Sequence, residues 1–189
     1  MIVWINGTFG AGKTTTSTLL QQKWNGSRLF DPEEVGYALG NNLRDYNVSN
    51  FQDLAPWRPL VVETIDQVAR FTGQNVIAVQ TVLDEDYWIE IHDGLVAKGH
   101  EVFHVVLESG QDILHARIDA DQNEQQAREW RHEHVDRYVD EREWMTAAAD
   151  LVVDTSAITQ DEAATRIHSA LESNVTRPAA EHANDHAVE

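Results

Sequence analysis

Five short apolar segments recur along the chain, separated by longer segments of mixed polarity. The apolar segments cover 2–5, 28–30, 76–79, 102–107 and 151–153. Between and after them, apolar residues recur at helical spacing in 14–24, 59–71, 87–98, 112–118 and 161–171. Short apolar strands that alternate with helices are typical of a parallel sheet covered on both faces. The pattern therefore predicts an α/β fold with a five-stranded parallel sheet and helices on both faces.

Two regions interrupt this alternation. The first, 40–59, is polar and aromatic, and we interpret it as an insertion on the substrate side rather than a core element. The second, 119–143, is almost wholly polar, and we expect a loop that leads into a surface helix and serves as a lid. The tail 173–189 has no periodicity and is expected to be disordered. A single domain over 1–172 accounts for the rest.

Composition narrows the possible partners. The chain has 189 residues and a formal net charge of -18, from 32 acidic and 14 basic residues. Such a surface repels phosphate backbones and anionic headgroups, so we expect no nucleic-acid partner, and no apolar segment is long enough for stable membrane insertion. The absence of cysteine excludes disulfides, thiolate metal sites and cysteine nucleophiles. With no signal-like segment before the first strand, we expect a cytoplasmic protein.

A phosphate-binding motif follows the first predicted strand. Residues 7–14 read GTFGAGKT and match G-x-x-x-x-G-K-[ST] between a strand and a helix. In such a loop, the backbone N–H groups and the following helix N-terminus form an anion site. We expect ATP here, with Lys13 on the β- and γ-phosphates and the Thr14 hydroxyl on Mg²⁺. The expected nucleotide contacts are Gly7, Thr8, Phe9, Gly10, Ala11, Gly12, Lys13, Thr14 and Thr15.

The class of phosphate-loop protein follows from what accompanies the motif. The chain has no N-K-x-D sequence for reading guanine, and 77–81 carries no carboxylate of the kind that ends a strand in many ATPases. A five-stranded core with a polar segment before the last strand has the outline of nucleoside monophosphate, shikimate and antibiotic kinases. We therefore expect a P-loop NTPase fold of the nucleoside/shikimate-kinase type with a lid.

Several segments of the first half also resemble a known family. Residues 2–10 (IVWINGTFG), 30–33 (FDPE), 36–39 (GYAL), 51–52 (FQ) and 57–58 (WR) are similar to the tunicamycin-resistance proteins of bacteria. The resemblance runs from the first residue to about residue 83. It implies an ATP-binding protein that recognises the nucleoside antibiotic tunicamycin and inactivates it by phosphorylation. Membrane association through the C-terminal region is also linked to the family, but this tail is short and acidic.

Asp31 is the candidate catalytic base. It follows the second predicted strand, beside the phosphate loop in a sheet of this type, where a carboxylate can accept the proton of an attacking hydroxyl. The alternative is a helix N-cap, because Asp31 is followed by proline and two glutamates, which suit the first turn of a helix. Both roles can coexist.

Three arginines in or near the lid segment are candidates for stabilising the transferred phosphoryl group. Arg117, Arg128 and Arg131 are expected to act catalytically, as lid arginines do in kinases of this outline. Alternatively, they pair with neighbouring glutamates on a surface helix, each such pair contributing at most about 1 kcal/mol.

The expected acceptor contacts lie in the 40–59 segment. Phe51, Trp57 and Arg58 offer stacking surface and a forked hydrogen-bond donor for a ligand with uracil and sugar groups. A packing cluster bounded by prolines is the alternative. Residues 154–156 (DTS), after the last strand, resemble the adenine-side loop of related kinases, although an ordinary turn would have the same composition.

Three functions remain open at this stage. The first is a kinase acting on tunicamycin or a similar nucleoside antibiotic. The second is an ATP-dependent binding protein that sequesters the drug without chemistry, and the third is a phosphate-loop NTPase switch. Neither the hydroxyl that is modified nor the oligomeric state follows from the sequence.

Overall fold

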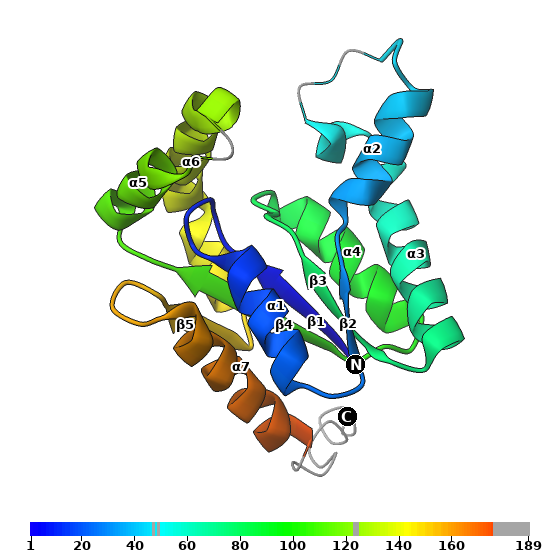
Figure 1. Cartoon of the computed structure of the whole chain (residues 1–189). Coiled ribbons are helices and arrows are strands. Elements are labelled where there is room, and N and C mark those ends of the chain that lie inside the picture. The colour runs from blue at the N-terminus through cyan, green and yellow to red at the C-terminus, as the bar shows by residue number, and fades with distance from the viewer. Residues whose placement is uncertain (47, 49, 123–124, 176–189) are drawn as a thin grey trace, which may run out of the picture.

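The five expected strands form one parallel sheet. In the computed structural model, which describes residues 1–46, 48, 50–122 and 125–175, the strand order is β2-β3-β1-β4-β5 (Figure 1). The strands are β1 Ile2–Asn6, β2 Ser27–Phe30, β3 Asn75–Val79, β4 Val102–Glu108 and β5 Leu151–Asp154. All four neighbouring pairs are parallel. The predicted five-stranded parallel sheet is confirmed.

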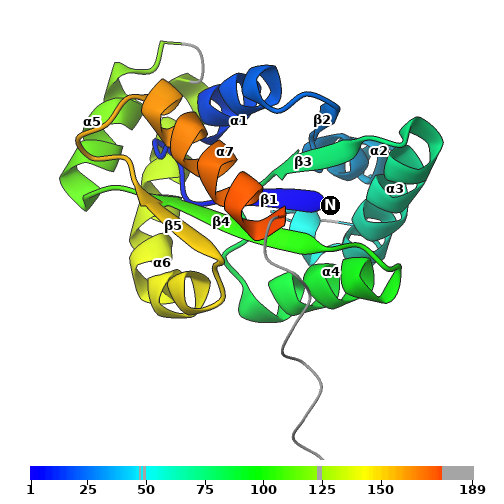
Figure 2. The ribbon, with the colours of Figure 1, turned by 90° about the horizontal axis from the view of Figure 1, so that it is seen from below.

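Helices cover both faces of this sheet, as expected. They are α1 Lys13–Lys23, α2 Glu33–Asn42, α3 Trp57–Thr72, α4 Glu85–Ala97, α5 Gln111–Ala120, α6 Arg128–Ala147 and α7 Gln160–Val175. The helices α1 and α7 lie together on one face, whereas α4 and α6 lie on the other (Figure 2). No helix among the described residues is long and apolar enough to cross a membrane.

The central strand β1 divides the core between the two faces. Its residues alternate sides, so Val3 and Ile5 pack with residues of α1 and α7, whereas Ile2 and Trp4 pack with residues of α3 and α4. All four side chains are completely buried. A strand buried on both faces must be apolar throughout, and this explains the uninterrupted apolar run at the start of the sequence.

The 40–59 region differs from its sequence-based interpretation as an insertion. Its first residues are the last turn of α2, and its last residues begin α3, with the short 3₁₀ helix η1 Phe51–Asp53 between them. Trp57 is completely buried in the core on the α3 and α4 side. Two glycines weaken the helical signal of α2. Gly36 is required there, because a Cβ atom at this position would lie 2.7 Å from the Phe51 ring.

The lid region and the tail also differ in detail. Helix α5 extends to Ala120, and the expected surface helix is α6, which buries Val135, Tyr138 and Met145. It is therefore part of the core as well as a cover for the site. Helix α7 continues to Val175, past the expected start of the tail at 173, and the remaining tail, 176–189, lies outside the described residues.

The sheet topology places a site at the carboxyl ends of the strands. After β1 the chain forms β2 and β3 on one side of it and then crosses to form β4 and β5 on the other side. Ligands of open α/β sheets bind at such a switch point. Figure 1 shows the loop between β1 and α1 there, with α2 on one side and α5 and α6 on the other.

Candidate active site

The loop between β1 and α1 depends on glycine at two positions. Gly7 has a φ of 128°, and a Cβ atom there would lie 2.3 Å from the carbonyl oxygen of Leu107. Gly10 has a φ of 78°, and its Cβ atom would lie 2.8 Å from the carbonyl oxygen of Leu114. Any side chain would therefore push the loop away from β4 and α5, which explains the glycines at positions 7 and 10.

Side chains from neighbouring strands fix the base of this loop. The Asn6 side chain accepts hydrogen bonds from the N–H groups of Gly7 at 2.8 Å and Val82 at 3.0 Å. The Thr81 hydroxyl donates to the carbonyl oxygen of Gly7 at 2.8 Å. The segment after β3 is thus attached directly to the phosphate loop, and both contribute to one site.

Lys13 is a shielded cation at the start of α1. Its ammonium donates to the carbonyl oxygen of Thr8 at 3.0 Å. Burial lowers the pKa of Lys13 from 10.5 to about 8, with the charge of Glu33 opposing this shift and that of Arg131 adding to it. A phosphate group beside Lys13 would add negative charge to that of Glu33, while the first helical N–H groups, which have no intrahelical acceptor, would bind its oxygens. The loop therefore fits the expected nucleotide.

Thr14 and Thr15 follow Lys13 in the first turn of α1, and both are exposed. Their exposure leaves both side chains accessible at the loop, and a hydroxyl oxygen is a suitable ligand for Mg²⁺.

Asp31 and Glu33 have different surroundings at the start of α2. The Asp31 carboxylate accepts a hydrogen bond from the N–H of Glu33 at 2.9 Å, and its side chain is exposed. It does not line the pocket beside the phosphate loop, whereas Glu33 does. Glu33 is also the carboxylate whose charge acts on Lys13. Asp31 therefore has the capping position, and Glu33 is the carboxylate that faces the site.

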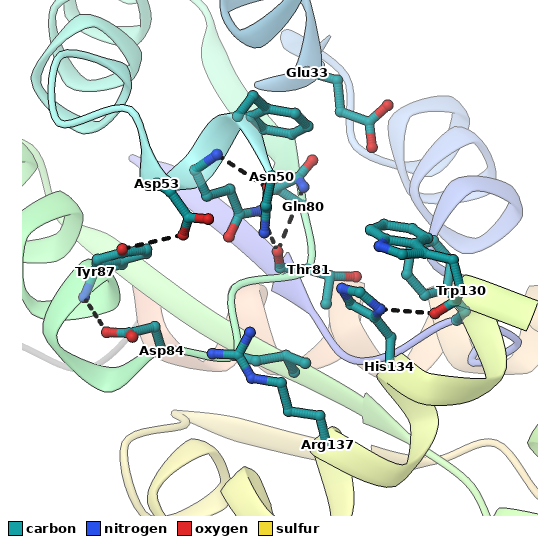
Figure 3. Close-up of a pocket in the computed structure, with 14 residues that line it drawn as sticks. Glu33, Asn50, Asp53, Gln80, Thr81, Asp84, Tyr87, Trp130, His134 and Arg137 are labelled. Carbon is teal, nitrogen blue, oxygen red and sulfur yellow. Dashed lines mark hydrogen bonds between the residues drawn. The ribbon is translucent and has the colours of Figure 1, made fainter. Parts of the chain in front are cut away.

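A narrow pocket lies between the phosphate loop, α2, η1, the start of α4 and α6. Glu33 enters it from α2, and Arg137 enters it from α6 on the opposite side (Figure 3). Its polar lining is Glu33, Asn50, Gln52, Asp53, Gln80, Thr81, Asp84, His134 and Arg137, and its other lining residues are Phe9, Phe51, Leu83, Tyr87 and Trp130. The pocket holds about 40 Å³. Small-molecule sites usually enclose at least ~300 Å³, so an acceptor requires this pocket to widen.

Hydrogen bonds fix the wall of this pocket that η1 and α4 form. Gln52 donates from its side-chain amide to the carbonyl oxygen of Thr81 at 2.8 Å. The Tyr87 hydroxyl donates to the Asp53 carboxylate at 3.3 Å. The Arg58 guanidinium lies 4.1 Å from the Tyr87 ring and donates to the carbonyl oxygen of Gln52 at 2.8 Å. Arg58 therefore positions this wall instead of forming part of the pocket surface.

The expected substrate contact of Trp57 is not available in this structure. Its side chain has no exposed surface, and its indole N–H donates to the carbonyl oxygen of Pro32 at 3.1 Å. Its ring packs edge-on against Phe51, with 5.4 Å between the ring centroids. Phe51 alone of the three expected contacts, Phe51, Trp57 and Arg58, lines the pocket.

The three expected lid arginines have separate positions. Arg117 donates to the carbonyl oxygens of Gly10 at 3.1 Å and Thr155 at 2.7 Å, so it joins the phosphate loop to the segment after β5. Arg131 lies 5.5 Å from the Phe9 ring and pairs with Asp121 at 2.8 Å. Arg128 lies 3.9 Å from the Asp119 carboxylate. Arg117 and Arg131 therefore lie at the phosphate loop. Arg128 pairs with an acidic side chain, as in the alternative interpretation, but with Asp119 rather than a glutamate.

Helix α6 is also attached to the phosphate loop through an aromatic cluster. The Phe9 ring lies 5.1 Å from Trp130 and 5.7 Å from His134, centroid to centroid. The Thr8 hydroxyl donates to the carbonyl oxygen of His134 at 3.1 Å. Burial lowers the pKa of His134, so its imidazole is neutral near pH 7. These contacts hold the first turns of α6 over the pocket.

Sequence reasoning missed most of the side chains that line the pocket, among them Glu33, Tyr87 and Arg137. Glu33 was assigned to the first turn of a helix, and Tyr87 was placed only within a predicted helix. Arg137 was not considered, although it is exposed, lines the pocket and forms no ion pair with a described residue. In a chain with only 14 basic residues, an arginine near the lid segment was the available signal.

Comparison with known proteins identifies the fold of this chain. No family model matches the chain, and no curated protein sequence matches it. The structure is similar to that of the tunicamycin resistance protein of Deinococcus radiodurans, with a TM-score of 0.72, 23% identity and coverage of 90% of this chain and 95% of that one.

Two further solved structures are kinases. Shikimate kinase from Acinetobacter baumannii, solved with shikimate, gives a TM-score of 0.64 at 15% identity over 93% of this chain and 95% of its own. The APS kinase of Mycobacterium tuberculosis, solved with AMPPNP and APS, gives a TM-score of 0.58 at 16% identity, over 90% of this chain and 96% of its own. The chain therefore has the P-loop fold of small-molecule kinases, which it shares with a tunicamycin resistance protein.

Proposed function

We propose that the protein is an ATP-dependent phosphotransferase that acts on a hydroxyl group of a small molecule. The observation that carries this proposal is the position of Glu33. Its carboxylate lines a polar pocket that adjoins the phosphate loop, and its charge acts on Lys13. A protein that only bound nucleotide would not need a carboxylate between the phosphate site and a second pocket.

Each residue has a role in this reaction. Bound ATP with Mg²⁺ supplies the phosphoryl group, and Lys13 and Thr14 are the residues that hold them. The Glu33 carboxylate accepts the proton of the acceptor hydroxyl as that oxygen bonds to the γ-phosphorus and the bond from phosphorus to the β–γ bridging oxygen breaks, which leaves ADP. Arg131 and Arg117 add positive charge beside the loop.

The acceptor belongs to the class of polyhydroxylated compounds with a ring that can stack. Amide and carboxylate side chains such as Asn50, Asp53 and Gln80 bind hydroxyl groups, and Phe51 and Tyr87 provide aromatic surface. Tunicamycin or a related nucleoside antibiotic fits this description, and the similarity to a tunicamycin resistance protein supports it. The competing function is binding of the drug without a reaction, but that function does not require a proton acceptor at Glu33.

Mass spectrometry decides between these functions. Tunicamycin incubated with the protein, ATP and Mg²⁺ should gain the mass of one phosphoryl group, and Lys13→Met should prevent the gain. Binding of unmodified drug with no mass change would establish the sequestering protein instead. Hydrolysis of ATP without drug binding would indicate the NTPase switch.

A further inference from the structure

A second depression lies beside the pocket, on the outer side of η1. It encloses about 370 Å³ between α2 and the segment that leads to η1. Its apolar lining is Tyr37, Leu43, Tyr46, Val48, Phe51 and Leu54. We call this depression the α2 groove. Tyr37 is 57% exposed and Tyr46 is 63% exposed, so large apolar surface faces solvent here. Exposed apolar surface gathered in one groove is typical of a binding site.

The α2 groove continues the acceptor pocket. Phe51 lines both, and the two are therefore separated by one side chain. Glu33 lies in the pocket, and Tyr37, one turn later on α2, lies in the groove and donates from its hydroxyl to the Glu33 carboxylate at 3.3 Å. From Glu33 to Gly40 the helix rises about 10 Å, so a ligand that extends from the reaction centre along α2 enters the groove.

The chemistry of the two cavities differs. The pocket is lined mainly by charged and amide side chains. Among the described residues that line the groove, the polar side chains are Asn41 and Arg44, and these hydrogen-bond each other at 3.2 Å. The α2 surface in the groove is smooth at Gly40, where an added Cβ atom would have no atom within 4 Å. A polar pocket that adjoins an apolar groove across one side chain fits a ligand with a polar head and an apolar chain.

We infer that the α2 groove binds an apolar chain carried by the acceptor, while the polar head of the same molecule occupies the pocket beside Glu33. This inference rests on the proposed function, because it identifies the class of acceptor as amphipathic. It assigns Phe51 to the junction between head and chain. It also gives Gly40 a role, since any larger side chain there would stand in the path of the chain.

Binding of alkyl glucosides tests the groove without any reaction. Calorimetric titration with n-hexyl, n-octyl and n-decyl β-D-glucosides, below their micelle-forming concentrations, should show affinity that rises up to about fourfold per added methylene. Gly40→Trp should abolish this dependence on chain length. Ala38→Trp is the matched control, because Ala38 is exposed on the same helix and lines neither cavity, and it should bind like wild type. Gly40→Leu serves if the tryptophan variant is unstable.

Turnover separates this inference from the proposed function. With tunicamycin as acceptor, Gly40→Trp should raise KM by about tenfold or more and leave the KM for ATP unchanged, as expected when several methylenes lose their site. Equal KM values for tunicamycin in Gly40→Trp and wild type would show that the groove does not bind the acceptor chain, while the kinase activity would still stand. Binding that depends on alkyl-chain length, without phosphorylation of any acceptor, would support the groove as a binding site and contradict the proposed kinase activity. Chain-independent binding, with dimerisation that Gly40→Trp abolishes, would assign the groove to a second copy of the chain.

Discussion

Asp31 and Glu33 are two residues apart, yet the Asp31 carboxylate binds the N–H of Glu33 while the Glu33 side chain lies in the pocket. The proline between them immediately precedes the helix and holds this arrangement, because its fixed φ suits a helical start. One carboxylate thus fixes the start of α2, and the other is presented to the site. A base at Glu33 and a cap at Asp31 are therefore separable by mutation.

Glu33→Gln should lower kcat by on the order of 10²-fold or more, because the amide cannot accept a proton. Nucleotide affinity should change only a few-fold, since Lys13 and the loop are intact. Asp31→Asn keeps a side-chain oxygen that can accept the N–H, so it should lose no more than about 1 kcal/mol of stability and retain most of its turnover. Steady-state kinetics and thermal unfolding of both variants check this prediction. A low kcat in Asp31→Asn, together with a normal kcat in Glu33→Gln, would instead identify Asp31 as the base.

ATP affinity should fall as the pH rises above 8. Burial lowers the pKa of the Lys13 ammonium to about 8 in the ligand-free protein, and only the charged form attracts phosphate. Below pH 8 the cation is present, and above it one proton must be taken up on binding. The Kd for ATP should therefore rise about tenfold per pH unit between roughly pH 8 and 10, while the phosphate, already ionised, does not titrate.

The matched control for this pH dependence is Lys13→Met, which removes the titrating group. Its ATP affinity should be weak and nearly independent of pH over the same range. If wild type and variant show parallel profiles, the titrating group is not Lys13. The charged form of Lys13 favours ATP binding but opposes folding of the ligand-free protein. The lowered pKa makes the charged lysine unfavourable in the folded state below pH 8, so Lys13→Met should raise the Tm of the ligand-free protein at pH 7.

Local features of the sequence were enough to predict the sheet and the phosphate loop. The strands are short and apolar because both faces are buried, and the loop needs Gly7 and Gly10 where its backbone approaches β4 and α5. Both properties depend on residues that are adjacent in sequence. The same holds for the cap at Asp31, which was one of the two interpretations offered for it.

Side-chain direction was harder to predict than secondary structure. Trp57 and Phe51 are both aromatic residues in a polar segment. Trp57 is the first residue of α3 and its side chain is completely buried in the core, whereas Phe51 lines the pocket. Glu33 reaches the pocket, and Glu34 does not, because successive helical positions point about 100° apart. Such differences depend on where a helix begins, and a boundary error of two residues changes which side chain faces the site.

Trp57→Ala should destabilise the fold rather than weaken acceptor binding alone. The indole is completely buried and its N–H is bonded to Pro32, so truncation leaves a cavity and removes this hydrogen bond. Loss of a buried tryptophan costs about 3–5 kcal/mol, a large fraction of the stability of a domain this size. Chemical denaturation should show this loss. Phe51→Leu is the contrast, and it should lower acceptor affinity with a smaller effect on unfolding. A stable Trp57→Ala protein that binds ATP but no acceptor would restore Trp57 as a substrate contact.

Arg137→Gln should raise the KM for the acceptor with little change in kcat or in the KM for ATP. Arg137 lines the pocket opposite Glu33 (Figure 3), is exposed, and forms no ion pair with a described residue, so its donors remain for a ligand. A hydrogen bond from a charged donor contributes about 1.5–3 kcal/mol, which corresponds to a KM increase of about tenfold to 150-fold. Arg142→Gln, on the same helix but paired with Glu108, is the control and should leave both KM values near wild type. A lower kcat with unchanged KM in Arg137→Gln would instead mean that this arginine acts in the transition state on the transferred phosphoryl group.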